Sequence, residues 1–131
     1  MRPVTLFTGQ WADLPFEKIC EMASSWGYDG LEIACWGDHM NLEKAAEDKT
    51  YCEEKKAILE KYHLKVWALG THIIGQCVGD RYDERLDGFA PTSLAGKPEA
   101  IREWGIKQMT LAPKAARNMG CQIVTGFTGS P

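Results

Sequence analysis

The sequence has no excess of basic residues, and this shortage limits what the protein can bind. Its 131 residues include 15 Lys and Arg against 18 Asp and Glu, so the formal net charge is −3. Proteins that hold a nucleic-acid backbone or an anionic membrane surface usually present a positive field. We therefore expect a small-molecule partner, and neither nucleic acid nor a membrane.

Long apolar runs and paired cysteines are also missing. No stretch approaches the roughly 18 apolar residues of a membrane span, and the N-terminus lacks the long apolar core of a secretion signal. The five cysteines are odd in number, and no two of them have the C-x-x-C spacing of a zinc or redox site. We therefore expect a reducing, cytoplasmic location.

Several common catalytic signatures are absent as well. No G-x-G-x-x-G follows the first predicted strand, and neither G-x-S-x-G nor H-E-x-x-H occurs. Residues 70–75 have the glycine spacing of a phosphate loop, but Gln76 stands where that loop requires lysine. These absences argue against dinucleotide-binding, hydrolase and zinc-protease functions.

What the sequence does contain is an alternation of strand and helix patterns. Short apolar runs predict strands at residues 4–8, 30–35, 65–70 and 121–126. Apolar residues at helical spacing predict helices at 16–26, 46–63 and 98–119. Near-continuous apolar strands joined by helices are typical of parallel βαβ units, so the predicted fold class is α/β.

Three local features qualify this pattern. The connection at residues 73–97 is far longer than the usual roughly two to six residues of a βα loop, which is typical of segments that serve a site or an interface. Pro113 lies inside the last predicted helix and removes a backbone hydrogen bond, so we expect a kink or a restart there. The charged run at residues 53–56 is typical of a solvent-exposed helix face.

Four strands and three helices make about half of a TIM barrel, which has eight strands and about 250 residues. We therefore expect residues 1–131 to be the N-terminal half of a single barrel domain that stops after the fourth strand. We also expect the protein to be a homo-oligomer.

Glu32 is the first candidate for a functional side chain. Alternation along the second strand places Leu31 and Ile33 on one face and Glu32 on the other, which faces the interior of a barrel. An unpaired carboxylate there would be strongly destabilising. Glu32 therefore either reaches the functional site or is paired with a group outside this sequence.

His72 is the second candidate, because it follows the third strand at the rim where parallel-sheet enzymes place their chemistry. A neutral imidazole there can bind a metal, hold a substrate hydroxyl or move a proton, whereas the alternative is a histidine that caps a loop. Trp11, Trp36 and Phe127 also fall at carboxyl ends of strands, where their rings either stack on a sugar or complete the core.

The remaining histidines and one aspartate are predicted to be structural. His39 lies in a loop, His63 at a helix end, and Asp29 precedes a strand at the opposite rim.

Three segments carry a family resemblance through their order and spacing. They are WGYDGLE at residues 26–32, THIIGQ at 71–76 and GFTGSP at 126–131. Together they resemble the sugar phosphate isomerase/epimerase family, which has the xylose-isomerase-like TIM barrel. The resemblance spans nearly the whole chain.

The resemblance implies an enzyme that isomerises or epimerises a sugar or sugar phosphate. In that family a divalent cation (Mn, Mg, Co or Zn) binds adjacent sugar oxygens while a proton, or in some members a hydride, moves between neighbouring carbons. It implies catalytic roles for Glu32 and His72, with Trp11, Trp36 and Phe127 as pocket wall. The main metal ligands are expected beyond residue 131, so we expect the chain alone to be inactive.

Three other interpretations remain open from the sequence. The same fold includes apurinic-site endonucleases, but these need several metal-binding histidines and favour a basic groove. A non-catalytic half-barrel that pairs with itself or another chain would hide its exposed sheet edges. A small doubly wound sheet would bind a phosphate ligand, and strand order distinguishes it from a barrel.

Overall fold

A computed structural model describes residues 1–130, which contain one four-stranded sheet. The strands are β1 (Thr5–Phe7), β2 (Gly30–Ala34), β3 (Lys65–Gly70) and β4 (Val124–Thr125). The α-helices are α1 (Phe16–Ser25), α2 (Leu42–Glu47), α3 (Lys49–Lys61), α4 (His72–Gly79) and α5 (Pro98–Met119). Three 3-10 helices complete the described elements: η1 (Thr8–Trp11), η2 (Glu84–Gly88) and η3 (Thr92–Leu94).

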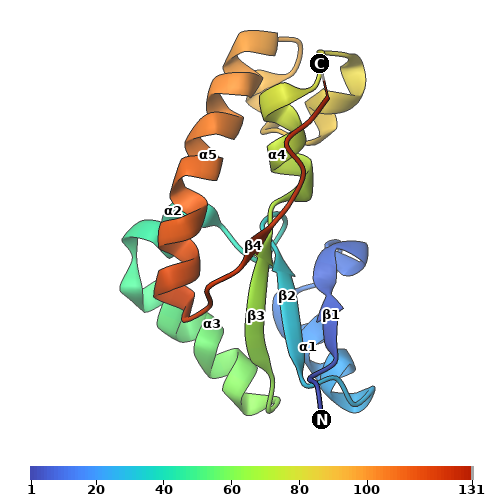
Figure 1. Ribbon diagram of the computed structural model, residues 1–131, viewed down its shortest axis with the longest axis vertical. Coiled ribbons are helices and arrows are strands. Elements are labelled where there is room, and N and C mark those ends of the chain that lie inside the picture. Colours follow the sequence, from blue (N-terminus) through green and yellow to red (C-terminus); the bar gives the residue numbers. More distant parts are fainter. Residues whose placement is uncertain (131) are drawn as a thin grey trace.

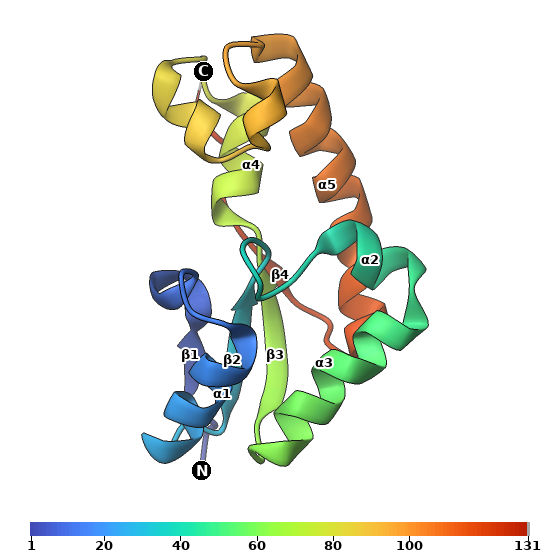
Figure 2. The same ribbon diagram turned by 180° about the vertical axis from the view of Figure 1, so that it is seen from behind.

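The strands lie side by side in sequence order and every neighbouring pair is parallel. In Figure 2 helix α1 lies in front of β1 and β2 with α3 beside β3, whereas the opposite view in Figure 1 shows the strands without a covering helix. This arrangement confirms the predicted α/β half-barrel architecture. The doubly wound alternative is wrong, because it requires helices on both faces and a different strand order.

The core lies between the sheet and these helices. Phe16, Ile19 and Cys20 form the buried face of α1, and Leu31 and Ile33 meet them from β2 with no exposed surface. The alternation along β2 predicted this division, because successive side chains of a strand point to opposite faces. Glu32 is therefore on the face that carries no helix.

The helix predicted at residues 46–63 is divided in two at Asp48. This residue has an extended backbone, with φ −116° and ψ 107°, and its carboxylate accepts the backbone N–H groups of Thr50 and Tyr51 at 2.9 and 3.3 Å. Such bonds are the N-cap of a new helix. Helix α2 therefore ends before Asp48 and α3 begins after it.

Lys55 contradicts the prediction that residues 53–56 are a solvent-exposed face. It is only 8% exposed, its Nζ donates to the Asp38 carbonyl oxygen at 2.6 Å, and it lies 4.5 Å from the centre of the Phe16 ring. Burial lowers the pKa of this ammonium group. The side chain joins α3 to the loop after β2 and to α1.

The connection predicted at residues 73–97 contains more structure than expected. It begins within α4, whose Ile74 and Cys77 are buried, and continues through η2 and η3. Helix α4 packs closely on α5 at Gly105, where a Cβ would lie 3.0 Å from the Cys77 Cβ. The apolar side chains of α4 are thus covered by α5.

Helix α5 continues through Pro113, so the predicted restart at this proline is wrong. The helix ends at Gly120, which has φ 82°. Neither this 22-residue helix nor any other within residues 1–130 is long and apolar enough to cross a bilayer.

Strand β1 is shorter than predicted because η1 follows Phe7 directly, and β4 is shorter because it pairs only with Leu69 and Gly70.

After β4 the chain runs along α4 (Figure 1). A Cβ at Gly75 would overlap the Phe127 carbonyl oxygen, so the close approach requires glycine there. The Ser130 N–H donates to the Asp80 carboxylate at 2.5 Å. Pro131, the last residue of the third segment of the resemblance, lies outside the described residues.

A bulge between β2 and β3 sets the register at the carboxyl end of the sheet. Leu31 is opposite Val66, but the next residue, Glu32, is opposite Ala68, so that Trp67 is extra. Beyond the bulge, Gly70 is opposite Ala34. Gly70 therefore shares the helix-free face with Glu32.

His39 belongs to a buried hydrogen-bond chain that fixes this rim. Its Nδ1 lies 2.9 Å from the Thr8 hydroxyl, its Nε2 lies 3.0 Å from the Leu14 carbonyl oxygen, and the same hydroxyl accepts the Ala34 N–H at 2.9 Å. Since a carbonyl only accepts, Nε2 donates to Leu14 and a neutral ring accepts at Nδ1. The predicted structural role of His39 agrees with this placement.

The pKa of His39 gives a prediction on acid stability. Burial lowers it below its ordinary value of 6.5, although the Leu14 carbonyl acts in the opposite direction. In the unfolded chain the imidazole binds a proton near pH 6.5. The stability that the buried neutral ring contributes is therefore fully present above that pH and is lost as the pH falls towards the folded pKa. In urea denaturation, we expect the free energy of unfolding of His39→Gln to be lower than that of the wild type at pH 7 and to decline less between pH 7 and pH 5. Parallel pH profiles for the variant and the wild type would contradict this.

Candidate functional site

Glu32 lies in β2 between Phe7 of β1 and Ala68 of β3. Its Oε1 accepts a hydrogen bond from the Thr125 hydroxyl at 2.5 Å, and the side chain keeps 23% of its surface exposed. A short bond from a hydroxyl to a carboxylate is strong. The carboxylate is therefore held in place from β4 while its remaining surface faces solvent.

His72 is the first residue of α4, directly beyond β3. Its Nε2 lies 3.8 Å from the Glu32 Oε1, which is too long for a direct hydrogen bond but close enough for both atoms to contact one ligand. Its Nδ1 is buried and has no hydrogen-bond partner within residues 1–130. The structure thus brings the two predicted catalytic residues together at the carboxyl-end rim.

Gly70 permits this approach because it has no side chain. A Cβ there would lie 2.6 Å from Cε2 of Phe7, 3.0 Å from Oε1 of Glu32 and 3.3 Å from Cε1 of His72. Three side chains from separate elements therefore occupy the space beside one glycine.

Aromatic rings surround His72 on two sides. Its ring centre lies 4.8 Å from that of Phe7 and 4.9 Å from that of Phe127. Trp36 contacts Phe7 edge-on at 5.9 Å, and Phe127 keeps 55% of its surface exposed. The Phe127 ring thus packs directly on the His72 ring, whereas Trp36 packs on Phe7.

Trp11, the third predicted aromatic wall, lies elsewhere. It belongs to η1, and its ring packs against Trp26 at the end of α1, 5.7 Å between centres. The structure does not bring it together with Glu32 and His72.

Phe7, Gly70 and Thr125 were not predicted as site residues. Alternation gives the signal for Phe7, because buried Leu6 places its successor on the helix-free face. Alternation in β4 likewise places Thr125, which is opposite Gly70, on the helix-free face. Gly70 had no such signal, since its face depends on the bulge at Trp67.

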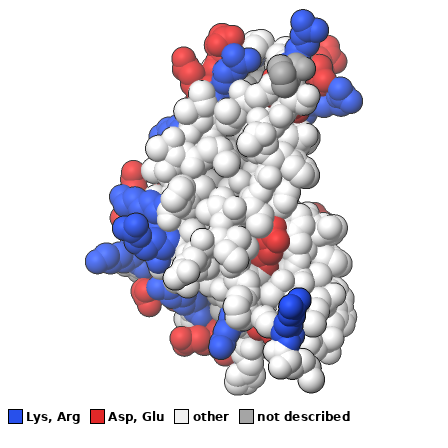
Figure 3. Space-filling model, viewed as in Figure 1, with Lys and Arg blue, Asp and Glu red and all other residues white. Residues whose placement is uncertain are grey.

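The surface around the site carries little charge. Figure 3 views the helix-free face, where charged side chains gather along one edge and near both ends, and the middle is uncharged apart from one acidic patch. An uncharged, aromatic-lined surface with a carboxylate and an imidazole suits a neutral polar ligand.

The described residues do not make a metal centre by themselves. No group of three His, Cys, Asp or Glu side chains in residues 1–130 is placed to hold an ion. Glu32 and His72 supply two donor atoms, whereas a stable site needs about three protein ligands. Other ligands would have to complete any metal site here.

The cysteines do not supply a nucleophile either. All five thiols are free and buried, and burial raises their pKa, in Cys20 to about 12. A buried thiol with a raised pKa is a poor nucleophile because the thiolate reacts, not the thiol.

Comparison with protein families agrees with this architecture. The model of the xylose isomerase-like TIM barrel family matches residues 20–131. The chain belongs to that family. No curated protein matches the chain significantly. The match includes β2, β3 and β4, and therefore Glu32, His72 and Phe127.

Replacement of Gly70 by alanine tests whether this position controls the site. We expect Gly70→Ala to reduce the free energy of unfolding by about 1–3 kcal/mol, because overpacking forces Phe7, Glu32 or His72 to move. Gly88→Ala is the matched control, since a Cβ there has no neighbour within 4 Å and φ is not positive. Urea denaturation measures both, and equal effects at the two positions would show that the crowding at Gly70 is unimportant.

The incomplete ligand set gives a second expectation. In calorimetric titration with Mn²⁺, residues 1–131 should bind the ion weakly, with a dissociation constant well above the micromolar range, because two donors do not hold a divalent ion tightly. Micromolar or tighter binding would mean that ligands other than Glu32 and His72 are present in this chain.

Proposed function

We propose that the protein is an isomerase or epimerase of a sugar or sugar phosphate, and that Glu32 and His72 act on the reacting carbons. The approach of the carboxylate and the imidazole to 3.8 Å, at the carboxyl-end rim of a xylose isomerase-like TIM barrel, is the observation that carries the proposal. Active sites of TIM barrels occupy this rim.

The two side chains suit proton transfer next to a carbonyl group. The Glu32 carboxylate accepts a proton from the carbon beside the carbonyl, while His72 donates a hydrogen bond to the carbonyl oxygen. Delivery of a proton to the former carbonyl carbon, while the hydroxyl proton of the first carbon passes to the former carbonyl oxygen, gives an isomer. Delivery of a proton to the opposite face of the first carbon, from a donor on that side, gives an epimer. A hydride shift between the two carbons is the alternative chemistry.

The surrounding residues support these roles. Thr125 fixes the carboxylate from β4, and Phe7 and Phe127 flank the imidazole. Exposed Phe127 offers an aromatic face to the C–H groups of a sugar and shields the reacting carbons from water. The expected divalent cation would need ligands beyond the described residues, and the steps above involve side chains alone.

Conservative substitutions in the complete protein test this function. Glu32→Gln and His72→Asn keep the approximate shape and remove charge or basicity. We expect each to lower kcat at least tenfold, about 1.4 kcal/mol of transition-state stabilisation, with little change in the thermal midpoint. Turnover is measured on a panel of aldoses, ketoses and their phosphates in deuterium oxide, where incorporation of deuterium distinguishes proton transfer from a hydride shift.

Matched controls separate this effect from a general loss of charge. Glu54→Gln changes an exposed glutamate of α3, and His63→Asn changes a histidine whose φ of 56° asparagine tolerates. Both should keep normal turnover. Normal turnover in Glu32→Gln and His72→Asn, or loss of activity in step with stability, would reduce these residues to a structural role.

A further inference from the structure

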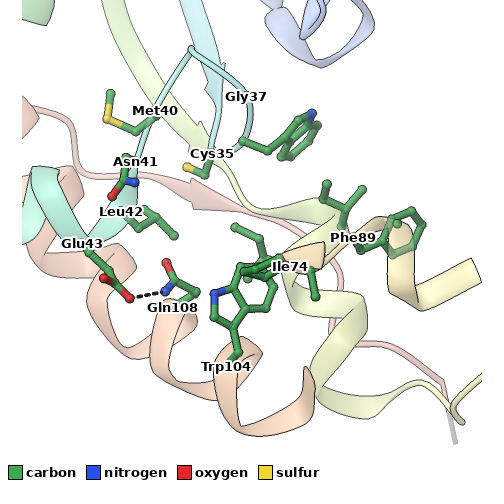
Figure 4. A pocket seen from close by; sticks show the side chains of 15 residues that line it. Cys35, Gly37, Met40, Asn41, Leu42, Glu43, Ile74, Phe89, Trp104 and Gln108 are labelled. Carbon is green, nitrogen blue, oxygen red and sulfur yellow. Dashed lines mark hydrogen bonds between the residues drawn. The ribbon is translucent and has the colours of Figure 1, made fainter. Parts of the chain in front are cut away.

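A cavity of about 510 Å³ opens at the carboxyl ends of β2 and β3, between the loop after β2 and helices α2, α4 and α5. Its volume is in the range of small-molecule binding pockets. Figure 4 shows side chains from these separate elements around one hollow. The lining side chains used below are Trp36, Asn41, Glu43, Phe89, Trp104 and Gln108.

The cavity adjoins the Glu32 and His72 site. Trp36 lines the cavity and also contacts Phe7, which packs on His72. Ile73 and Ile74, which directly follow His72 in α4, also line the cavity. The cavity and the Glu32 and His72 site are therefore neighbours at the carboxyl-end rim.

The polar groups of the cavity are built into the fold. Gln108 is only 6% exposed, and its amide donates to the Glu43 Oε1 at 2.8 Å. The ammonium group of Lys107 lies 2.9 Å from the same oxygen. The bond from Lys107 has the larger effect and the bond from Gln108 the smaller one, and together they hold the pKa of Glu43 below its usual range. The carboxylate is therefore ionised.

Acceptor atoms of this pair remain free for a ligand. Within residues 1–130, neither the second carboxylate oxygen of Glu43 nor the amide oxygen of Gln108 accepts a hydrogen bond, and the indole N–H of Trp104 donates none. Trp104 and Gln108 lie one turn apart on α5 and face the same hollow (Figure 4). The cavity thus presents two acceptors and one donor beside an aromatic face.

This combination selects the kind of ligand. Hydroxyl groups donate to carboxylate and amide oxygens, and the flat C–H face of a sugar ring packs on indole and phenyl rings such as those of Trp36, Phe89 and Trp104. The lining contains no Lys, Arg or His to bind a phosphate, and its one charged residue, Glu43, is already paired with Lys107. A neutral, hydroxyl-bearing ring fits.

We propose that this cavity is a second subsite, which binds a neutral sugar ring joined by a glycosidic bond to the sugar at Glu32 and His72. The substrate is then a disaccharide or similar glycoside, not a lone monosaccharide. This inference rests on the proposed function, because the reacting sugar defines which ring enters the cavity.

Calorimetric binding to the complete protein tests the subsite with defined probes. These are maltose, cellobiose and lactose, with glucose, galactose and glucose 6-phosphate as single-ring references. We expect at least one disaccharide to bind at least tenfold more tightly than its component monosaccharides. Trp104→Ala and Gln108→Leu should remove that advantage, so that each disaccharide binds no more tightly than its component monosaccharides.

Trp26→Ala is the matched control, because Trp26 is 49% exposed and packs on Trp11, away from the cavity. Trp104→Phe, which keeps most of the apolar volume and removes the N–H donor, replaces Trp104→Ala if the alanine variant has a lowered thermal midpoint. Disaccharides that bind no more tightly than monosaccharides, or equal effects of Trp104 and Trp26 variants, would overturn the subsite.

The two proposals fail in different ways. If Glu32→Gln slows monosaccharide turnover but no disaccharide gains affinity, the subsite is wrong and the proposed function stands. If a disaccharide binds through Trp104 and Gln108 but Glu32→Gln and His72→Asn turn over normally, the cavity is a saccharide site and the proposed function is wrong.

Discussion

The missing side chain at Gly70 is the constraint on which the candidate site depends. Phe7, Glu32 and His72 come from β1, β2 and α4, and all three meet in the space that a Cβ at this position would fill. Their approach also needs the parallel order of the strands, which brings three carboxyl ends to one rim. Thr125 then reaches Glu32 across the same gap. The site is a property of the packed sheet, and no single segment contains it.

A second set of buried bonds holds the rim beside this gap. The Cys35 N–H donates to the Gly70 carbonyl oxygen at 2.9 Å, and the Thr8 hydroxyl joins His39 to Ala34. These bonds fix the chain on both sides of Trp36, which lines the cavity and also contacts Phe7 of the Glu32 and His72 site. Buried polar groups that are fully paired tend to specify one arrangement. The two proposed binding regions therefore share one rigid wall.

Sequence patterns predicted the parts of this structure that depend on short-range periodicity. Alternation placed Leu31 on the covered face and Glu32 on the open one, and position after a strand placed His72 at the rim. The same patterns did not reveal the division at Asp48 or the burial of Lys55. An aspartate can lie inside a helix or cap a new one, and a lysine in a charged run is usually solvated. The outcome at Asp48 depended on capping geometry, and the outcome at Lys55 depended on a partner distant in the sequence, the Asp38 carbonyl oxygen.

By itself, the sequence determined the class of fold and the candidacy of Glu32 and His72, because strand and helix periodicity and position after a strand are local properties. Only the tertiary structure decided which face Gly70 occupies. Without the bulge at Trp67, Gly70 would lie opposite Cys35 on the covered face, and with it Gly70 lies opposite Ala34 on the open face. The tertiary structure also decided where the cavity forms, since Glu43 and Gln108 are 65 residues apart and meet only because α2 packs on α5. Contacts between distant segments follow from how the layers pack, and no local pattern encodes them.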